Sequence, residues 1–317
     1  MRQTLKILVT GGAGFIGSHV ADALLEEGHS VVVLDDLSSG RAENVPEKAL
    51  FLEGDLRDAA LVDRAFAEHD FDVVCHQGAQ TSVSVSTREP VRDAEINVIG
   101  GLNVLEAARA HGIARFVFAS TGGAIYGDIP EGQRAGEGWP PQPISPYACS
   151  KLAFERYLAA YHHEHGTPST ILRYANVYGP RQDPHGEAGV VAIFCQRLAS
   201  GEKIRINAMR EVGDAGCVRD YVYVADVVKA NLLAIQGKLE GKVINVGSGE
   251  GTSTLQLAER IEAALGVKTD KEWGTRRAGD LERSVLEPND ELQRHTGPAT
   301  PIADGIRETA RWFAGRA

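Results

Sequence analysis

Two ionisable side chains four residues apart, Tyr147 and Lys151, are the residues of this sequence best suited to proton transfer. They fall in an expected helix, 146–164, where this spacing places both side chains on one face. A phenol with a pKa of about 10 is protonated at neutral pH unless a nearby cation stabilises the phenolate, and Lys151 can supply that cation. Thr121, which ends an apolar run, offers a hydroxyl partner. The three residues are typical of a tyrosine base, although Tyr and Lys at this spacing also occur by chance on amphipathic helices.

A glycine-rich loop near the amino terminus, Thr10–Gly17, predicts a dinucleotide site. It follows a β-branched apolar run and precedes a helical pattern, so backbone N–H groups at a helix N-terminus can meet a pyrophosphate. Asp35 ends the next apolar run, 18 residues after Gly17, where a carboxylate binds the ribose hydroxyls of adenosine. Asp36 adds a negative charge that would repel a 2′-phosphate. We therefore expect NAD rather than NADP, and we interpret the nearby Arg41 as a solvated loop residue.

Short apolar runs alternate with amphipathic segments along the first 120 residues or so, which indicates a parallel sheet covered by helices on both faces. The expected fold class is α/β: a doubly wound, Rossmann-type parallel sheet with a smaller, discontinuous C-terminal substrate domain. Strands are expected at 5–9, 31–34, 51–52, 73–75, 116–119 and 169–172. Helices are expected at 18–27, 59–67, 99–111, 146–164, 190–200, 254–265 and 300–313. The runs at 218–224 and 243–246 are predicted to return to the sheet. The predicted NAD-binding Rossmann domain is 1–178 with 218–247, and the predicted substrate domain is 179–217 with 248–317.

Composition excludes several classes of protein. The chain has 33 Lys and Arg against 43 Asp and Glu, for a net charge of −10, so no basic surface for nucleic acid or an anionic membrane is expected. Its four cysteines form no CxxC pair, and the histidines at 162, 163 and 165 are interpreted as cations at a helix end. No metal is expected. Without a signal peptide or a run of about 18 apolar residues, the sequence predicts a cytoplasmic protein.

Taken in order, these motifs resemble the extended branch of the short-chain dehydrogenase/reductase superfamily, and within it the UDP-glucose 4-epimerases and their sugar-nucleotide-modifying relatives. The resemblance covers essentially the whole chain. The segments that carry it are 10–17, 35–40, 54–56, 76–80, 120–127, 147–151, 173–181, 219–222 and 277–280. It implies NAD-dependent C4 epimerisation of a UDP-hexose through a 4-keto intermediate, in a homodimer that pairs the helices near 100–111 and 146–164.

By resemblance, Tyr147 is the base, Lys151 lowers its pKa and binds the nicotinamide ribose, and Thr121 bonds the sugar O4. The other residues implied for NAD are Gly11, Gly14, Phe15, Ile16, Gly17, Asp35, Asp36, Leu37, Ser39, Gly40, Asp55, Leu56, Gln77, Gly78, Ala79, Asn97 and Tyr174. Those implied for the UDP-sugar, besides Thr121 and Tyr147, are Gln80, Asn176, Gly189, Val190, Ile206, Arg219, Arg277, Asp280 and Ser284.

Some of these residues also have simpler interpretations. Asp55 could cap the helix expected from 59, and Arg219 could form a local salt bridge with Asp220. By resemblance, the arginines pair with the diphosphate, Asp280 takes a uridine ribose hydroxyl, and Ser284 faces the C2 substituent of the sugar. Because serine is small, N-acetylated hexoses are expected to fit as well as plain ones.

Other enzymes and one non-enzyme remain as alternatives. A UDP-glucuronate 4-epimerase, a 4,6-dehydratase or a decarboxylase would use the same fold. Gly122 and Gly123 stand where dehydratases and decarboxylases commonly carry an acidic pair, which favours an epimerase, and this loop is one residue longer than the common form. A non-catalytic NAD-sensing scaffold is disfavoured by the intact Thr121, Tyr147 and Lys151.

Overall fold

The computed structural model describes residues 4–185, 189–239, 243–277 and 279–316, which form two compact units. The first unit contains the described parts of 1–121, 145–173 and 228–244. The second contains those of 122–144, 174–227 and 245–317. The predicted division into two functional domains stays a prediction, and its boundaries differ from those of the compact units at 122–144, 174–178, 218–227 and 245–247.

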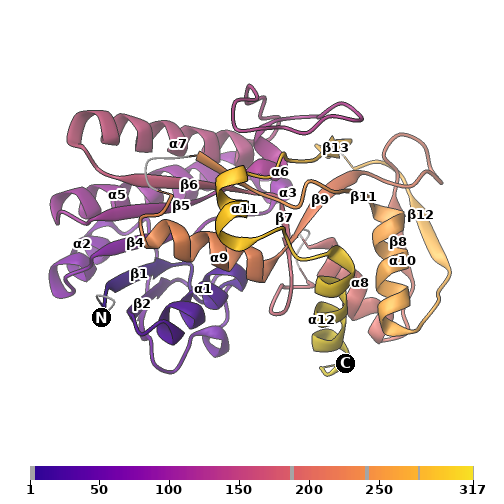
Figure 1. Ribbon diagram of the computed structural model, residues 1–317, viewed down its shortest axis with the longest axis horizontal. Coiled ribbons are helices and arrows are strands. Elements are labelled where there is room, and N and C mark those ends of the chain that lie inside the picture. The colour runs from indigo at the N-terminus through magenta and orange to yellow at the C-terminus, as the bar shows by residue number, and fades with distance from the viewer. Residues whose placement is uncertain (1–3, 186–188, 240–242, 278, 317) are drawn as a thin grey trace. The chain divides into compact units, whose positions relative to one another are not determined.

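A seven-stranded sheet follows the order expected of a Rossmann fold (Figure 1). In spatial order its strands are β10 (Val243–Val246), β6 (Ser169–Tyr174), β5 (Arg115–Thr121), β4 (Val73–His76), β1 (Lys6–Thr10), β2 (Ser30–Asp35) and β3 (Leu50–Glu53). The pairings from β5 through β4, β1 and β2 to β3 are parallel. The chain therefore starts near the middle of the sheet and winds outward in both directions, and the predicted doubly wound class is confirmed.

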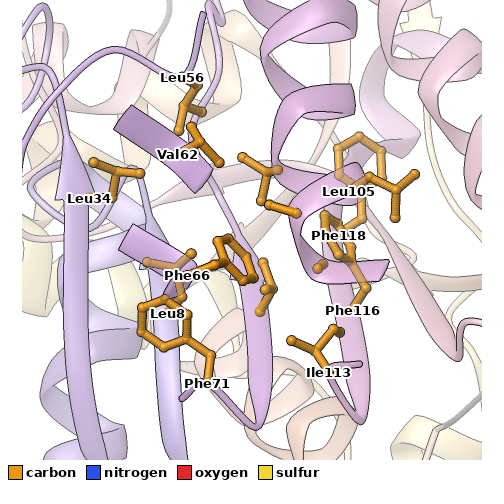
Figure 2. Packing of buried hydrophobic residues seen from close by; sticks show 14 of the residues in the cluster. Leu8, Leu34, Leu56, Val62, Phe66, Phe71, Leu105, Ile113, Phe116 and Phe118 are labelled. Carbon is orange, nitrogen blue, oxygen red and sulfur yellow. The ribbon is translucent and has the colours of Figure 1, made fainter. Parts of the chain in front are cut away.

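Helices cover the sheet on both faces, which explains its continuous apolar strands. On one face, α2 (Ala59–Glu68), α5 (Gly101–Ala110) and α7 (Pro146–His165) bury side chains against the strands. Figure 2 shows Phe66 and Leu105 of these helices beside Leu8 and Phe118 of the sheet. Alternate strand residues such as Val33 are also fully buried, and α1 (Phe15–Glu26) packs against β1 and β2.

The ends of α7 are set by local sequence. The Ser145 hydroxyl accepts the Ala148 N–H at 3.3 Å, and Pro146 occupies the first helical position, where its missing N–H costs nothing. Gly166 ends the helix with a left-handed φ of 67°, a conformation that glycine adopts without strain. The predicted helix over 146–164 is confirmed.

Two features of the first unit differ from the expected pattern. The helix expected from residue 99 begins at Gly101, because the chain first passes through α3 (Val83–Arg88), α4 (Pro90–Ala94) and a π-helix, η2 (Glu95–Gly100). A helix, α9 (Val224–Ile235), was not predicted, although Val227, Ala230 and Ala234 are buried at helical spacing.

Smaller sheets and three packed helices form the second unit. Strand β9 (Val218–Tyr223) pairs with β7 (Asn176–Tyr178), β11 (Gly251–Ser253) and β13 (Arg283–Ser284), while β8 (Ile204–Asn207) pairs with β12 (Lys271–Gly274). The prediction that 218–224 returns to the central sheet is therefore wrong, whereas that for 243–246 is confirmed. The core packs α8 (Val190–Ala199), α10 (Thr254–Leu265) and α12 (Ile302–Ala314); α6 (Gly122–Ile125) and α11 (Asp290–Thr296) are shorter. No helix in the described part of the chain has the length and apolarity needed to cross a membrane.

Candidate active site

The glycine loop between β1 and α1 combines close backbone packing with one open position. A Cβ at Gly17 would lie 2.2 Å from the Gly11 carbonyl oxygen, and one at Gly11, where φ is 67°, would lie 2.6 Å from the Gly78 backbone. Gly14 differs, because its Cβ would come within 4 Å only of the Gly11 oxygen, at 3.2 Å, among the described residues beyond its chain neighbours. Gly14 is also the N-cap of α1 and supplies no capping side chain. Backbone N–H groups at this helix start are thus open to an anion such as a pyrophosphate.

Asp35, at the end of β2, connects the glycine loop to the loop that follows β2. Its carboxylate accepts the N–H groups of Ala13 at 3.0 Å and Leu37 at 2.9 Å. Burial raises the pKa of Asp35, and these backbone donors partly offset that effect. Leu37 has a left-handed φ of 56°, which is strained for a leucine. The predicted residues Asp35 and Leu37 are therefore brought together with the glycine loop, as a ribose-binding site requires.

A buried histidine that sequence reasoning missed supports the same loop. The Thr10 hydroxyl accepts the Gly78 N–H at 3.1 Å and lies 2.7 Å from His76 Nδ1. Burial lowers the pKa of His76 to about 3, so its ring is neutral, and Nδ1 shares a hydrogen bond with the Thr10 hydroxyl. The hydrogen bond from Gly78 to Thr10 holds Gly78 beside Gly11. Short sequence motifs do not reveal this contact between separate segments.

The three predicted catalytic residues meet where β5 ends and α7 begins. The Thr121 side chain lies within hydrogen-bonding reach of the Tyr147 phenol. Desolvation raises the pKa of Tyr147 to about 12, against the lowering effect of a hydrogen bond with Thr121. Lys151 is 3% exposed; its Nζ donates to the Ala119 carbonyl at 2.9 Å and lies 4.8 Å from the centre of the Phe118 ring. The arrangement can pass a proton between a phenol and a substrate hydroxyl beside a buried ammonium.

Below this site lies a buried ionic cluster that the sequence did not predict. Glu155 accepts hydrogen bonds from Ser120 Oγ at 2.6 Å and from Arg173 Nε at 2.9 Å, and its other oxygen lies 2.5 Å from Arg173 Nη2. All three residues are buried. Glu155 falls one helical turn after Lys151, so the same face of α7 carries both residues.

Asn97, on η2, holds the segment after β4. Its side-chain oxygen accepts the Gln80 N–H and its amide donates to the Gln80 carbonyl, both at 2.9 Å. The structure thus brings together two predicted residues, Asn97 and Gln80. A π-helix is rare, and such turns are frequently found at functional sites. Gln77, at the start of the same segment, donates to Asn231 Oδ1 at 2.9 Å.

Asp55 does not cap α2, so that interpretation is wrong. Asp58 is the N-cap and accepts the N–H groups of Ala60 and Leu61, whereas Asp55 pairs with the Arg57 guanidinium. That hydrogen-bonded pair lowers the pKa of Asp55. The other predicted NAD residues lie at or beyond the carboxyl ends of the parallel strands and at the start of α1: Phe15, Ile16, Asp36, Ser39, Gly40, Leu56, Ala79 and Tyr174.

In the second unit, Arg219 and Ser284 are register partners on the adjacent strands β9 and β13. The proposed salt bridge between Arg219 and Asp220 is wrong, because the buried Asp220 carboxylate accepts hydrogen bonds from the backbone N–H groups of Ser248, Gly249 and Leu286. Arg219 donates to the Val218 carbonyl and forms no ion pair among the described residues. Its guanidinium therefore retains the capacity to pair with an anion.

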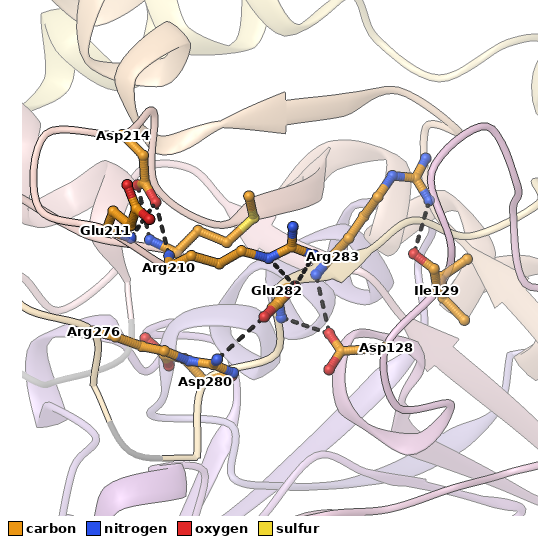
Figure 3. A network of polar contacts seen from close by, with 10 residues as sticks. Asp128, Ile129, Arg210, Glu211, Asp214, Arg276, Asp280, Glu282 and Arg283 are labelled. Atoms are coloured by element: carbon orange, nitrogen blue, oxygen red, sulfur yellow. Dashed lines mark hydrogen bonds and ion pairs between the residues drawn. The ribbon is translucent and has the colours of Figure 1, made fainter.

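The segment that carries Arg277 and Asp280 is held by a polar network (Figure 3). Asp128 accepts the N–H groups of Glu282 at 2.5 Å and of Arg283 at 3.1 Å. Glu282 in turn pairs with Arg210 at 2.7 Å and with Arg276 at 3.2 Å, and hydrogen bonding to Arg210 is the largest cause of its lowered pKa. Arg277 and Asp280 themselves pair at 3.2 Å. Asp128 and the Glu282 cluster position this predicted substrate segment, and spacing did not predict them.

The remaining predicted substrate residues occupy separate elements of the second unit. Asn176 begins β7, and its buried Oδ1 has no hydrogen-bond partner among the described residues, which leaves an acceptor for a donor group of a ligand. Gly189 and Val190 start α8. Ile206, in β8, is fully buried in the core of the second unit, so no part of this predicted residue is exposed to a ligand. No group of three or more metal-binding side chains is found among the residues that the structure describes.

Comparisons with known proteins find similar sequences and structures over nearly the whole chain. The model of the NAD dependent epimerase/dehydratase family matches residues 7–247. UDP-glucose 4-epimerase of Mycolicibacterium smegmatis is 43% identical over 316 residues, which cover 98% of each chain. The solved UDP-glucose 4-epimerase of Thermus thermophilus in complex with NAD is 51% identical, with a TM-score of 0.94 over 99% of this chain and 100% of that one. The Thermotoga maritima enzyme with UDP-glucose is 44% identical, with a TM-score of 0.93 over 98% and 99%.

Proposed function

The chain belongs to the NAD-dependent epimerase/dehydratase family, and we propose that it interconverts UDP-galactose and UDP-glucose by inverting C4 of the sugar. The observation that carries this proposal is the meeting of Thr121, Tyr147 and Lys151 at the end of β5. Full-length similarity to UDP-glucose 4-epimerases, at 43% to 51% identity in the relatives described above, supports the choice of reaction. The resemblance stated from the motifs is confirmed at the level of the family.

The residues of the first unit fit NAD. The open helix start at Gly14 suits a pyrophosphate, and the Asp35 carboxylate suits a ribose. Reversible oxidation at C4 is the chemistry that NAD supplies when bound. Because epimerisation returns the substrate to its original oxidation state, we expect the cofactor to stay bound through turnover.

The protein's own residues move the O4 proton. Tyr147 removes it as C4 is oxidised and returns it when C4 is reduced, so no net proton is consumed. Thr121 bonds both the phenol and the sugar O4, which holds the two oxygens in reach of each other. The Lys151 ammonium stabilises the phenolate, because a positive charge favours the ionised form of a nearby phenol. A phenol with a pKa of about 12 depends on such cations to react at neutral pH.

The second unit is proposed to hold the UDP moiety. The guanidinium groups of Arg219 and Arg277 have the fork geometry that pairs with a diphosphate. Asp280, which pairs with Arg277 in the structure, would accept a hydrogen bond from a ribose hydroxyl once Arg277 turns to the ligand. Ser284 lies on β13, beside Arg219 of β9; it is small and 2% exposed. We propose that its size allows N-acetylated hexoses as well as plain ones.

A homodimer in the cytoplasm completes the proposal. Large apolar side chains are exposed on one of the helices expected to pair, Tyr157 at 42%, and on the segment that leads into the other, Val91 at 71% and Ile99 at 50%. These belong to α4, η2 and α7, and a second copy would bury them. The four cysteines are free, which suits a reducing compartment.

Incubation of the purified protein with UDP-galactose and no added cofactor tests the reaction. UDP-glucose is the expected product, and a 4-keto-6-deoxy sugar would overturn the proposal. The Tyr147→Phe variant should retain NAD and lose turnover. Tyr157→Phe, on the same helix, is the matched control: it removes a phenol outside the cluster of Thr121, Tyr147 and Lys151 and keeps the apolar ring, so it should keep full activity. Unchanged turnover in Tyr147→Phe would remove Tyr147 from its assigned role.

A further inference from the structure

A buried carboxylate, Asp93 in α4, lies behind the first turns of α7. It is completely inaccessible to solvent. Its oxygens accept hydrogen bonds from Ser150 Oγ at 2.6 Å, Gln80 Nε2 at 2.7 Å and Asn97 Nδ2 at 3.1 Å. All three donors are neutral, and Asp93 forms no ion pair among the described residues. A carboxylate this deep needs a compensating charge in its surroundings, because desolvation disfavours an isolated ion.

Charge balance around Lys151 identifies that compensating charge. Asp93 on α4 and Glu155 on α7 act electrostatically on the ammonium, which in turn acts on His76 on β4. Tyr147 lies one helical turn before Lys151 on α7, and Arg173 on β6 is in contact with Glu155. Glu155 is already paired with Arg173, and His76 is neutral. This leaves one buried ammonium and one buried carboxylate, Lys151 and Asp93.

We infer that Asp93 is the counter-charge of Lys151, a positioning residue that keeps the ammonium charged inside a desolvated site. The inference rests on the proposed function only in assigning Lys151 to catalysis. Asp93 reaches the site through Ser150, the residue next to Lys151, and through the Gln80 and Asn97 side chains. These bonds hold the carboxylate at a constant place while it acts through space on α7.

The charge of Asp93 raises the pKa of both catalytic groups, which helps Lys151 stay protonated but opposes ionisation of Tyr147. Burial lowers the pKa of Lys151 to about 8, and the field of Asp93 raises it against that trend. After desolvation and the Thr121 bond, the same field also raises the pKa of Tyr147. Asp93 thus preserves the ammonium and makes the phenol less acidic. Neutralising Asp93 should therefore move both groups in one direction, toward lower pH.

Asp93→Asn tests this directly, because an amide has the shape of the carboxylate and can still bond Gln80, Asn97 and Ser150. We would follow the titration of the ¹³Cε resonance of Lys151 in NAD-loaded protein, assigned by its loss in Lys151→Met. The midpoint should fall by about one pH unit, as expected for removing a nearby unit charge. Ser150→Ala, which removes a bond to Asp93 and no charge, should leave the midpoint in place, and Asp93→Glu should restore it.

The pH profile of kcat/KM supplies a second readout. In Asp93→Asn both limbs should move to lower pH together, which loss of packing alone would not cause. An unmoved Lys151 midpoint in folded Asp93→Asn, or an equal displacement in Ser150→Ala or Asp93→Glu, would overturn the inference. If Asp93→Asn does not fold, Asp93→Ser is held to the same outcomes. The resonance is measured without substrate, so a protein that lacks epimerase activity but shows the displaced midpoint would refute the proposed function alone.

Discussion

Removing the charge of Glu155 should destabilise the first unit strongly. Glu155 lies between Ser120 and Arg173, and the side chains of the ion pair are 3% and 5% exposed. The Glu155→Gln substitution keeps the shape of the residue, yet it removes the negative charge. It also turns one of the two oxygens that face the guanidinium into an amide nitrogen, so a donor meets a donor.

The expected cost follows from this geometry. The buried Arg173 guanidinium would lose the negative charge of Glu155 and one of its two close bonds to residue 155. Breaking a buried ion pair at one partner costs about 3–5 kcal/mol. An exposed pair is worth far less, about 0.2–1 kcal/mol. Glu89→Gln, at an ion pair with Arg92 whose side chains are 46% and 51% exposed, is therefore a control matched in chemistry and in structural unit.

Urea unfolding followed by circular dichroism measures both variants. A loss of about 3 kcal/mol or more is expected for Glu155→Gln, against at most about 1 kcal/mol for Glu89→Gln. Arg173→Met, alone and combined with Glu155→Gln, completes a double-mutant cycle. The double variant should be less destabilised than the sum of the single variants by at least about 1 kcal/mol. A loss below about 1 kcal/mol in Glu155→Gln, or simple additivity in the cycle, would refute the reasoning.

Three further predictions concern single positions. Gly14→Ala should fold and weaken NAD binding, since among the described residues its Cβ would meet only the Gly11 carbonyl oxygen, at 3.2 Å. Gly17→Ala should destabilise the apo-protein more, because its Cβ would lie 2.2 Å from the same oxygen. Cofactor titration and thermal unfolding separate the two effects. Ser284→Tyr should lower the rate with UDP-GlcNAc relative to UDP-Glc, and an unchanged ratio of kcat/KM values would count against the proposed contact with C2. Desolvation alone would raise the pKa of Asp214, but four backbone N–H donors outweigh it and hold that pKa far below its usual value. The stability that this carboxylate contributes is fully present above the unfolded pKa of about 3.9 and is lost as pH falls toward the lowered pKa. Pepsin should therefore cut the loop at 209–216 only in strong acid. At neutral pH, trypsin should cut Asp214→Asn at Arg210, where the natural protein resists.

Local signals in the sequence were sufficient for the nucleotide loop and for the sheet that carries it. Thr10–Gly17 lies between an apolar run and a helical pattern, and Asp35 follows at the expected distance. Segments that are close in sequence therefore suffice to predict that the glycine loop and Asp35 are close in space. The same holds for Tyr147 and Lys151, which are joined by one helical turn. Such pairs depend only on the repeat of the secondary structure that contains them.

Residues that depend on the packing of separate elements were not predicted. Asp58, rather than Asp55, caps α2, because capping is decided by backbone geometry at the turn and not by the presence of a carboxylate. Val218–Tyr223 forms a β-rich segment as expected, but its strand pairs outside the central sheet. Strand composition predicts burial of a segment and carries little information about its partner.

The buried face of α7 shows why the supporting cluster escaped a reading based on apolar periodicity. Tyr147, Lys151 and Glu155 recur every four residues, and Lys151 and Glu155 are buried on α7 together with apolar residues such as Phe154. Each of these three polar groups has a partner from a neighbouring strand: the Thr121 hydroxyl for the phenol, the Ala119 carbonyl for the ammonium, and Ser120 with Arg173 for the carboxylate. Satisfied groups of this kind specify one register between helix and sheet, because a shift of α7 by a single turn would leave several buried charges unpaired. Glu155 thus repeats the four-residue spacing of Tyr147 and Lys151. Its bonds to the neighbouring strands fix the position of α7 along β5, and with it the position of the two catalytic residues.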